Sequence, residues 1–68
     1  MQSKKNKIKK MIKDYYNKEF LDFQDQDFIG IYSGNDFDYA IMRNNGYYTQ
    51  FAIDLNRNQI GIPLTTSK

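Results

Sequence analysis

Three short, turn-forming links separate four segments of alternating apolar and polar residues in this chain. The segments are residues 28–33, 37–43, 47–54 and 60–64, and the links 34–36, 44–46 and 56–58 are rich in glycine, asparagine and aspartate. Alternation with a period of two predicts β-strands. Links this short join neighbouring antiparallel strands but cannot cross over between parallel ones. We therefore expect a four-stranded antiparallel meander.

Residues 4 to about 22, ahead of these strands, show the spacing of an amphipathic helix. Ile8, Met11, Ile12 and Tyr15 recur at intervals of three and four residues, which places them on one helix face. Ser3 is a candidate N-cap. A helix packed on one side of the meander makes a two-layer α+β sandwich of order α-β-β-β-β, in a single small domain over residues 1–68.

Both ends of the helix depart from this simple pattern. Lysines are disfavoured near the positive N-terminus of a helix, so residues 1–7 are expected to fray or to await an anion. The apolar stripe fails near Lys18. We expect Phe20, Leu21 and Phe23 to form a separate hydrophobic hook beyond it.

The register of the second hairpin depends on the turn around Asn45. A two-residue turn at Asn45-Gly46 would pair Ile41 with Gln50, whereas a three-residue loop over residues 44–46 would pair Ile41 with Thr49. We prefer the three-residue loop, because it gathers one coherent apolar face towards the helix. The predicted inner face then consists of Phe37, Tyr39, Ile41, Phe51, Ile53, Ile60, Ile62 and Leu64.

The other side of the sheet is expected to be unusually apolar. One helix covers only one side, and the wet side of an antiparallel sheet should be polar. In the first hairpin either Phe28 and Tyr32 or Ile29 and Ile31 face the helix, and the sequence leaves both alternatives open. An exposed apolar patch marks an interaction site, so we predict a partner-binding surface formed by Ile29, Ile31, Met42 and Tyr48. Scattered residues, or a covering by the hydrophobic hook, are the alternatives.

Charge is divided along the chain. The first thirteen residues carry six lysines and no acid, and the next twenty-five carry seven acids and one lysine. Such separation creates a field that can select partners. The six lysines are candidates for contacts with nucleic-acid phosphates: Lys4, Lys5, Lys7, Lys9, Lys10 and Lys13. The acidic segment could dock a basic protein surface, and plain solvation of both charged segments is the simplest alternative.

Composition excludes several kinds of site. The chain has no cysteine and no histidine, so it lacks disulfides, thiolate metal sites and the commonest catalytic base. The spacings of calcium loops and phosphate loops are also absent. We therefore expect no enzyme activity, no metal, no cofactor and no small-molecule substrate. Neither a signal-peptide pattern nor a membrane-spanning run is present, so we expect a cytoplasmic protein that does not bind membranes.

One hairpin resembles a known family. Residues 29–36, followed by Tyr39-Ala40-Ile41, are similar to the central hairpin of the SUKH immunity superfamily. In that family a glycine-rich turn joins two strands, and the resemblance implies a protein that acts by binding partner proteins. The similarity covers this hairpin, and the family's glycine run is missing from it.

These observations together favour a small non-enzymatic protein-binding module. We expect its partner to be another protein, a second copy in a homodimer, or both. Small size and a composition rich in lysine, asparagine, isoleucine and tyrosine suggest an inhibitor or modulator of a host protein machine, encoded by a phage-type mobile element. The alternative is a nucleic-acid-binding protein that uses the lysine-rich helix.

Overall fold

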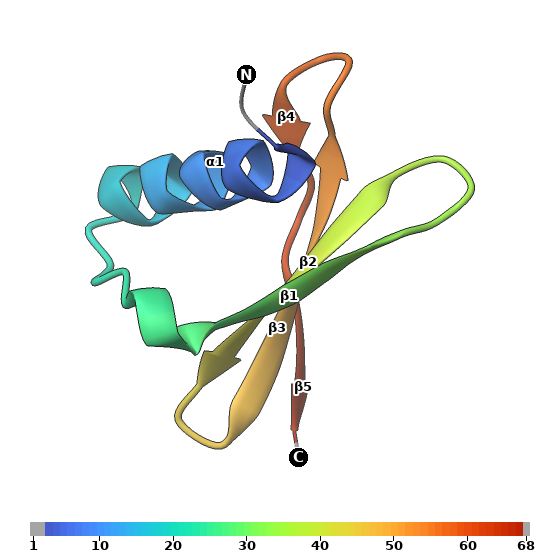
Figure 1. Cartoon of the computed structure of the whole chain (residues 1–68). Helices are drawn as coiled ribbons and strands as arrows, with labels where there is room; N and C mark the ends of the chain where they lie inside the picture. The colour runs from blue at the N-terminus through green and yellow to red at the C-terminus, as the bar shows by residue number, and fades with distance from the viewer. Residues whose placement is uncertain (1–2, 68) are drawn as a thin grey trace.

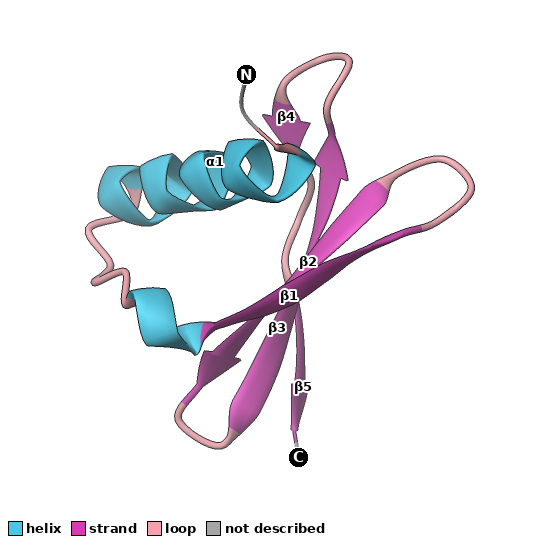
Figure 2. Ribbon diagram, viewed as in Figure 1, coloured by secondary structure: helices cyan, strands magenta, loops and turns pink. Residues whose placement is uncertain are grey.

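The chain folds into one helix layer and one sheet layer, as Figures 1 and 2 show for the computed structural model. The structure describes residues 3–67. In this part of the chain, α1 (Lys4–Lys18) and a short 3-10 turn, η1 (Asp25–Asp27), precede five strands. These are β1 (Phe28–Ser33), β2 (Asp38–Asn44), β3 (Tyr47–Asp54), β4 (Gln59–Ile60) and β5 (Leu64–Ser67). The predicted α+β class, with a helix followed by an antiparallel sheet, is confirmed.

Helix α1 begins and ends where its local sequence indicates. The Ser3 hydroxyl accepts a hydrogen bond from the Asn6 amide at 3.1 Å, which confirms the predicted N-cap. Residues 4–7, which were expected to fray, lie within the helix, whereas residues 1 and 2 lie outside the described part. Ile8 and Ile12 are fully buried against the sheet. The helix ends at Lys18, where the apolar stripe fails, and not near residue 22.

The core lies between α1 and the sheet and is dominated by apolar side chains. Phe51 at its centre meets the helix through aromatic contacts, edge-on to Tyr15 with ring centroids 5.6 Å apart and tilted against Tyr16 at 6.2 Å. Six apolar residues expose no more than 1% of their surface: Ile8, Ile12, Ala40, Met42, Phe51 and Ile53. The predicted inward positions of Phe51 and Ile53 are confirmed, and those of Phe37, Tyr39 and Ile41 are wrong.

The turn between β2 and β3 explains this error. Asn45 and Gly46 both have positive φ, 45° and 86°, and Asn44 pairs directly with Tyr47. This is the two-residue turn, so Ile41 pairs with Gln50 and the preferred three-residue loop is wrong. Asparagine and glycine tolerate positive φ, and a turn of this kind matches the twist of the strands it joins. The local turn chemistry therefore prevails, and the even-numbered residues of β2 face the helix.

A bulge in β1 resolves the two alternatives for the first hairpin. Phe28 pairs with Met42 and Gly30 pairs with Ile41, so Ile29 is an extra residue on its strand. Side chains before and after the bulge therefore do not alternate simply. Phe28 and Ile31 pack against the core, while Ile29 and Tyr32 project to the other side, so each alternative was half right.

The predicted last strand is broken into two. Ile60 of β4 pairs with Ile53, as expected, but Leu64 of β5 pairs with Gln50. From Ile60 to Leu64 the edge strand advances four residues, whereas its partner β3 advances only three between Ile53 and Gln50. The extra residue moves the side chains after Gly61–Pro63 to the other face of the sheet. Ile62 is 87% exposed and Leu64 63% exposed, so their predicted place on the inner face is wrong.

The segment after α1 does not form the expected hook. Phe23 packs edge-on against Tyr16, with ring centroids 5.6 Å apart. Phe20 is 97% exposed and has a φ of 59°. The Leu21 amide donates to the Tyr16 carbonyl at 2.8 Å, and the Phe20 amide donates to the Asn17 carbonyl at 3.2 Å. This is a Schellman C-cap, in which the left-handed position is usually glycine.

Replacing Phe20 by glycine should therefore stabilise the protein. A left-handed conformation costs an L-residue about 1–2 kcal/mol, and an exposed ring contributes little in return, so we expect a gain of about 1 kcal/mol. Urea unfolding of Phe20→Gly against wild type measures this gain. Phe20→Ala is the matched control, because it removes the ring but keeps the strained Cβ. An equal gain in both variants would contradict backbone strain as the cause.

Candidate functional site

The side of the sheet opposite α1 forms a broad surface, called here the outer face. Directly paired residues on neighbouring strands project to the same side, so the register fixes its members in rows across the sheet. Tyr32, Tyr39 and Ala52 form one row, and Ile41, Gln50 and Leu64 form the next. With the bulge residue and a third row, the outer face consists of Ile29, Tyr32, Tyr39, Ile41, Arg43, Tyr48, Gln50, Ala52, Leu64 and Thr66.

This surface is apolar at its centre, and the formal charges of its described residues lie at its two ends, Arg43 beside Tyr48 and Asp54 at the end of β3. Ile29 is 51% exposed, Tyr32 46% and Leu64 63%, although all three are large hydrophobic side chains. Scattered exposed apolar residues are ordinary, but a contiguous patch marks an interaction site. The hydrophobic hook does not cover it, because Phe23 packs against Tyr16, whose ring lies against Phe51 of the core. The outer face therefore stays exposed in the single chain.

A tyrosine ridge crosses this surface. The Tyr32 hydroxyl donates to Gln50 Oε1 at 2.8 Å, which ties β1 to β3 across the intervening strand. The ring of Tyr32 stacks on that of Tyr39, with centroids 5.1 Å apart and planes inclined by 20°. Both contacts restrict rotation of the Tyr32 side chain. The ridge is thus ordered before any partner arrives, which lowers the entropic cost of binding.

A shallow depression lies beside the ridge. It has a volume of about 420 Å³ and is lined by Ile29, Ile41, Tyr48, Gln50 and Thr66. Its walls are mainly apolar, with one amide and two hydroxyl groups. Such a lining suits an apolar side chain of a partner, since it offers no carboxylate or amine for acid–base chemistry. Among residues 3–67, no group of three or more acidic side chains is placed to hold a metal ion.

Two of the four predicted partner-binding residues lie on this surface. Ile29 and Tyr48 line the depression together. Ile31 faces the core, and Met42 is 1% exposed within it, so their predicted place on the outer face is wrong. The two-residue turn turns Met42 inward and brings Ile41 outward in its place. The Asn-Gly dipeptide was the signal that could have identified Ile41.

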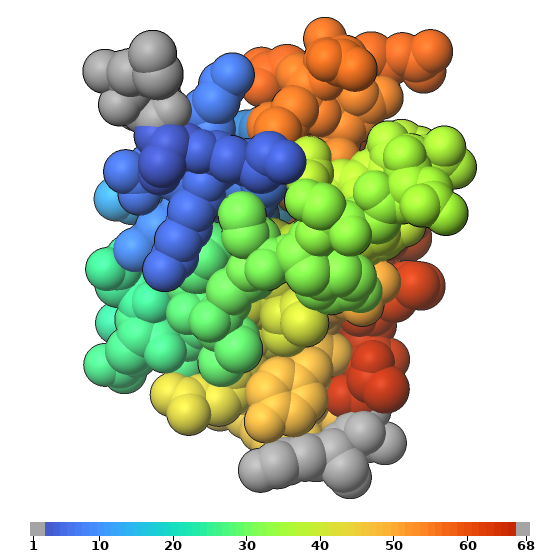
Figure 3. Space-filling view, turned by 45° about the vertical axis from the view of Figure 1, so that its right-hand side comes forward, coloured from blue at the N-terminus to red at the C-terminus, as the bar shows by residue number. Residues whose placement is uncertain are grey.

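The six predicted nucleic-acid-binding lysines belong to the opposite layer, on α1. Lys4 Nζ lies 3.1 Å from Asp38 Oδ1, and Lys9 Nζ lies 2.7 Å from Asp25 Oδ1. Figure 3 shows the first turns of α1, in blue, lying directly against the green residues of β1. The basic and acidic segments that are separate in the sequence are thus partly paired in space.

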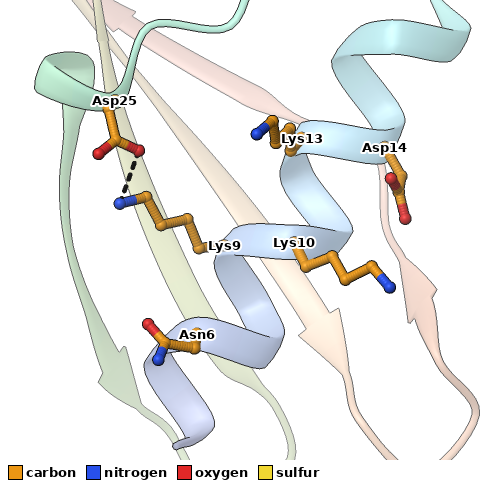
Figure 4. Close-up of a pocket in the computed structure, with 6 residues that line it drawn as sticks. All are labelled: Asn6, Lys9, Lys10, Lys13, Asp14 and Asp25. Atoms are coloured by element: carbon orange, nitrogen blue, oxygen red, sulfur yellow. Dashed lines mark ion pairs between the residues drawn. The ribbon is translucent and has the colours of Figure 1, made fainter. Parts of the chain in front are cut away.

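Three of the six lysines, Lys9, Lys10 and Lys13, line a groove on this layer (Figure 4). It has a volume of about 540 Å³ and is lined by Asn6, Lys9, Lys10, Lys13, Asp14 and Asp25. Lys9 points to Asp25, whereas Lys10 points away from it. The outer-face tyrosines lie on the other side of the sheet. Single-strand binders combine cations and stacking aromatics in one groove, whereas the residues that line this groove include no aromatic side chain.

The contact between Lys4 and the first hairpin predicts a pH dependence of stability. Hydrogen bonds from Ser33 and Lys4 to Asp38 hold the pKa of that carboxyl below its ordinary value. A carboxylate with a lowered folded-state pKa stabilises the fold above its unfolded-state pKa, near 4. That stabilisation is lost as the pH falls through the lower, folded-state pKa.

Asp38→Asn should therefore flatten the loss of stability between pH 5 and pH 2. Urea midpoints measured across this range for wild type and variant give the result. Asp36→Asn, at an exposed position in the adjacent turn, is the control and should keep the wild-type slope. An unchanged slope in Asp38→Asn would show that this carboxylate does not couple folding to pH.

Comparison of the chain with protein-family models, with curated proteins and with solved structures finds no match. The resemblance of the first hairpin to the SUKH superfamily therefore gains no support from a family model. No helix within residues 3–67 has the length and apolarity needed to cross a lipid bilayer.

Proposed function

We propose that this chain is a small non-enzymatic protein-binding module and that the outer face is its contact surface. The single observation that carries the proposal is the large apolar exposure on this side of the sheet, whose centre carries no charge, with Leu64, Ile29 and Tyr32 between 46% and 63% exposed. Aromatic residues are enriched and charged residues depleted at the centre of protein interfaces. The outer face has this composition.

The arrangement of the outer face supports binding of a protein better than of a small molecule. Its depression is open and lies beside the tyrosine ridge, so a partner would contact a broad, uneven surface and not an enclosed pocket. Small-molecule sites bury most of their ligand. A role as inhibitor or modulator of a host machine, encoded by a mobile element, stays a prediction from size and composition.

Affinity capture with matched variants tests the proposal. Tagged wild type, Ile29→Lys, Tyr48→Lys and Tyr47→Lys are each exposed to a low-GC bacterial lysate supplemented with an untagged copy of the chain. Tyr47 is the control because it precedes Tyr48 on β3, is 49% exposed and projects to the opposite side. We expect wild type and Tyr47→Lys to capture the same proteins. Ile29→Lys and Tyr48→Lys should capture at least tenfold less of them. Equal capture by the wild type and all three variants would contradict a contact role for the outer face.

The nucleic-acid alternative has one observation in its favour, the groove lined by Lys10 and Lys13. Titration of random DNA and RNA at increasing salt tests it, because phosphate contacts release counterions and weaken steeply with salt. Binding at low salt that is lost in Lys10→Glu and Lys13→Glu would support it. Absence of binding even at low salt would remove it.

A further inference from the structure

We infer that the occupant of the outer face is a second copy of this chain, packed face to face about a two-fold axis. This inference rests on the proposed function and names the partner of the same surface. A two-fold interface packs one surface patch against the same patch of the second copy. The patch must therefore not repel itself by charge, must be large enough for a stable contact and must have a shape that fits its own copy. The outer face meets each of these three conditions.

The first condition is the absence of uncompensated charge. Like charges that meet across an interface cost several kcal/mol, and the outer face has none at its centre. At one end of the sheet Arg43 lies 3.5 Å from Asp27, and at the other end Arg57 lies 3.8 Å from Asp54. Each end therefore carries a charge of both signs, and a second copy can approach in either orientation without repulsion.

The helix layer, in contrast, carries uncompensated positive charge. Lys5, Lys7, Lys10 and Lys13 form no ion pair with any residue of the described part, 3–67. A two-fold contact through α1 would bring these lysines of both copies together. Self-association is therefore directed to the outer face.

The second condition is area. The molecule measures 31 × 24 × 19 Å along its principal axes, and a two-layer fold is thinnest across its layers. The broadest projection of the whole molecule is therefore on the order of 700 Å², which is the upper limit for a flat contact through the sheet side and lies near the roughly 800 Å² per partner of a standard interface. A chain of 68 residues buries little surface alone and gains stability from such a contact.

The third condition is a surface shape that is complementary to its own copy. Leu64 and Ile29 project from the surface, at 63% and 51% exposure, close to the depression that Ile29 lines with Ile41 and Tyr48. Each copy therefore supplies both an apolar projection and an apolar hollow. Reciprocal insertion of this kind is the pattern of an isologous interface.

Analytical ultracentrifugation of the full chain, from micromolar to millimolar concentration, tests the inference. We expect the mass to rise from one chain to two, with a dimer association constant at least tenfold weaker in Tyr48→Lys and in Leu64→Lys. Leu64→Lys replaces an exposed side chain, so it keeps the test valid if Tyr48→Lys unfolds. Tyr47→Lys should associate like wild type.

Two results would overturn the inference. One is a wild-type chain that stays monomeric at millimolar concentration, and the other is a dimer that Tyr48→Lys and Leu64→Lys leave unchanged. In the first case, lysate capture that still depends on Ile29 and Tyr48 would leave the proposed function standing with a different partner. Capture that is independent of both residues would overturn the proposed function as well.

Discussion

Met42→Lys should unfold this protein at room temperature. Met42 is 1% exposed and faces α1 from β2. A lysine side chain at this position would place an ammonium group in the core that contains Ile8, Ile12 and Phe51. A buried charge without a partner costs roughly 3–5 kcal/mol. A domain of 68 residues has a total stability of only about 3–10 kcal/mol. Far-UV circular dichroism and urea unfolding should show a strongly weakened or absent cooperative transition.

The matched variant is Tyr48→Lys, in the neighbouring strand but on the outer face. Its lysine can extend along the sheet and keep its ammonium group in water, so we expect the variant to fold. The pair also tests the register of the second hairpin, because a three-residue loop would have put Met42 outside. A Met42→Lys protein with a wild-type urea midpoint would contradict the two-residue turn at Asn45-Gly46.

Phe51→Ala should cause the largest loss among apolar truncations. Phe51 is 1% exposed and joins the two layers through its contacts with Tyr15 and Tyr16. Removal of a buried phenyl ring costs about 3–5 kcal/mol, through lost burial and a remaining cavity. Ile8 and Ile12 of α1 are buried in the same core as this ring, so the cavity should loosen the contact between α1 and the sheet.

Urea unfolding followed by circular dichroism measures this loss, and Phe37→Ala is the control. Phe37 is also a phenylalanine, but it is 42% exposed at the margin of the outer face, so its truncation should cost less than about 1 kcal/mol. Similar losses in the two variants would show that the core is not centred on Phe51. Phe51→Leu should lose less than Phe51→Ala, since leucine refills part of the cavity.

Most secondary structure could be predicted from local patterns. The bounds predicted for β1 and β3 match the structure, whereas α1 ends at Lys18, where the apolar stripe fails, and not near residue 22 as predicted. The N-cap at Ser3 was also identified correctly. These features depend on residues a few positions apart, whose hydrogen bonds and backbone angles are set within one turn or one strand.

The candidate site could be predicted only in part. An apolar side of the sheet was expected, and Ile29 and Tyr48 were placed on it, but Ile41 and Leu64 were assigned to the core. Three one-residue shifts misled the prediction. The two-residue turn at Asn45-Gly46 moved Ile41 outward and Met42 inward, the bulge at Ile29 moved Ile31 inward, and the break at Gly61–Pro63 moved Leu64 outward. Because side chains alternate with a period of two, a shift of one residue moves every later side chain to the other face.

The same division applies to charge. In the sequence, a basic N-terminal segment is separate from an acidic middle segment. The fold nevertheless pairs Lys4 with Asp38 and Lys9 with Asp25. No local pattern records these approaches, since the paired residues lie 34 and 16 positions apart.

The sequence by itself determined the order of helix and strands, the cap and the turn residues, because these follow from short-range hydrogen bonding and allowed backbone angles. Only the tertiary structure decided which residues are exposed on the outer face and which charges neutralise each other. Those outcomes depend on the register of strands and on contacts between distant segments, and a single inserted residue is enough to reverse them.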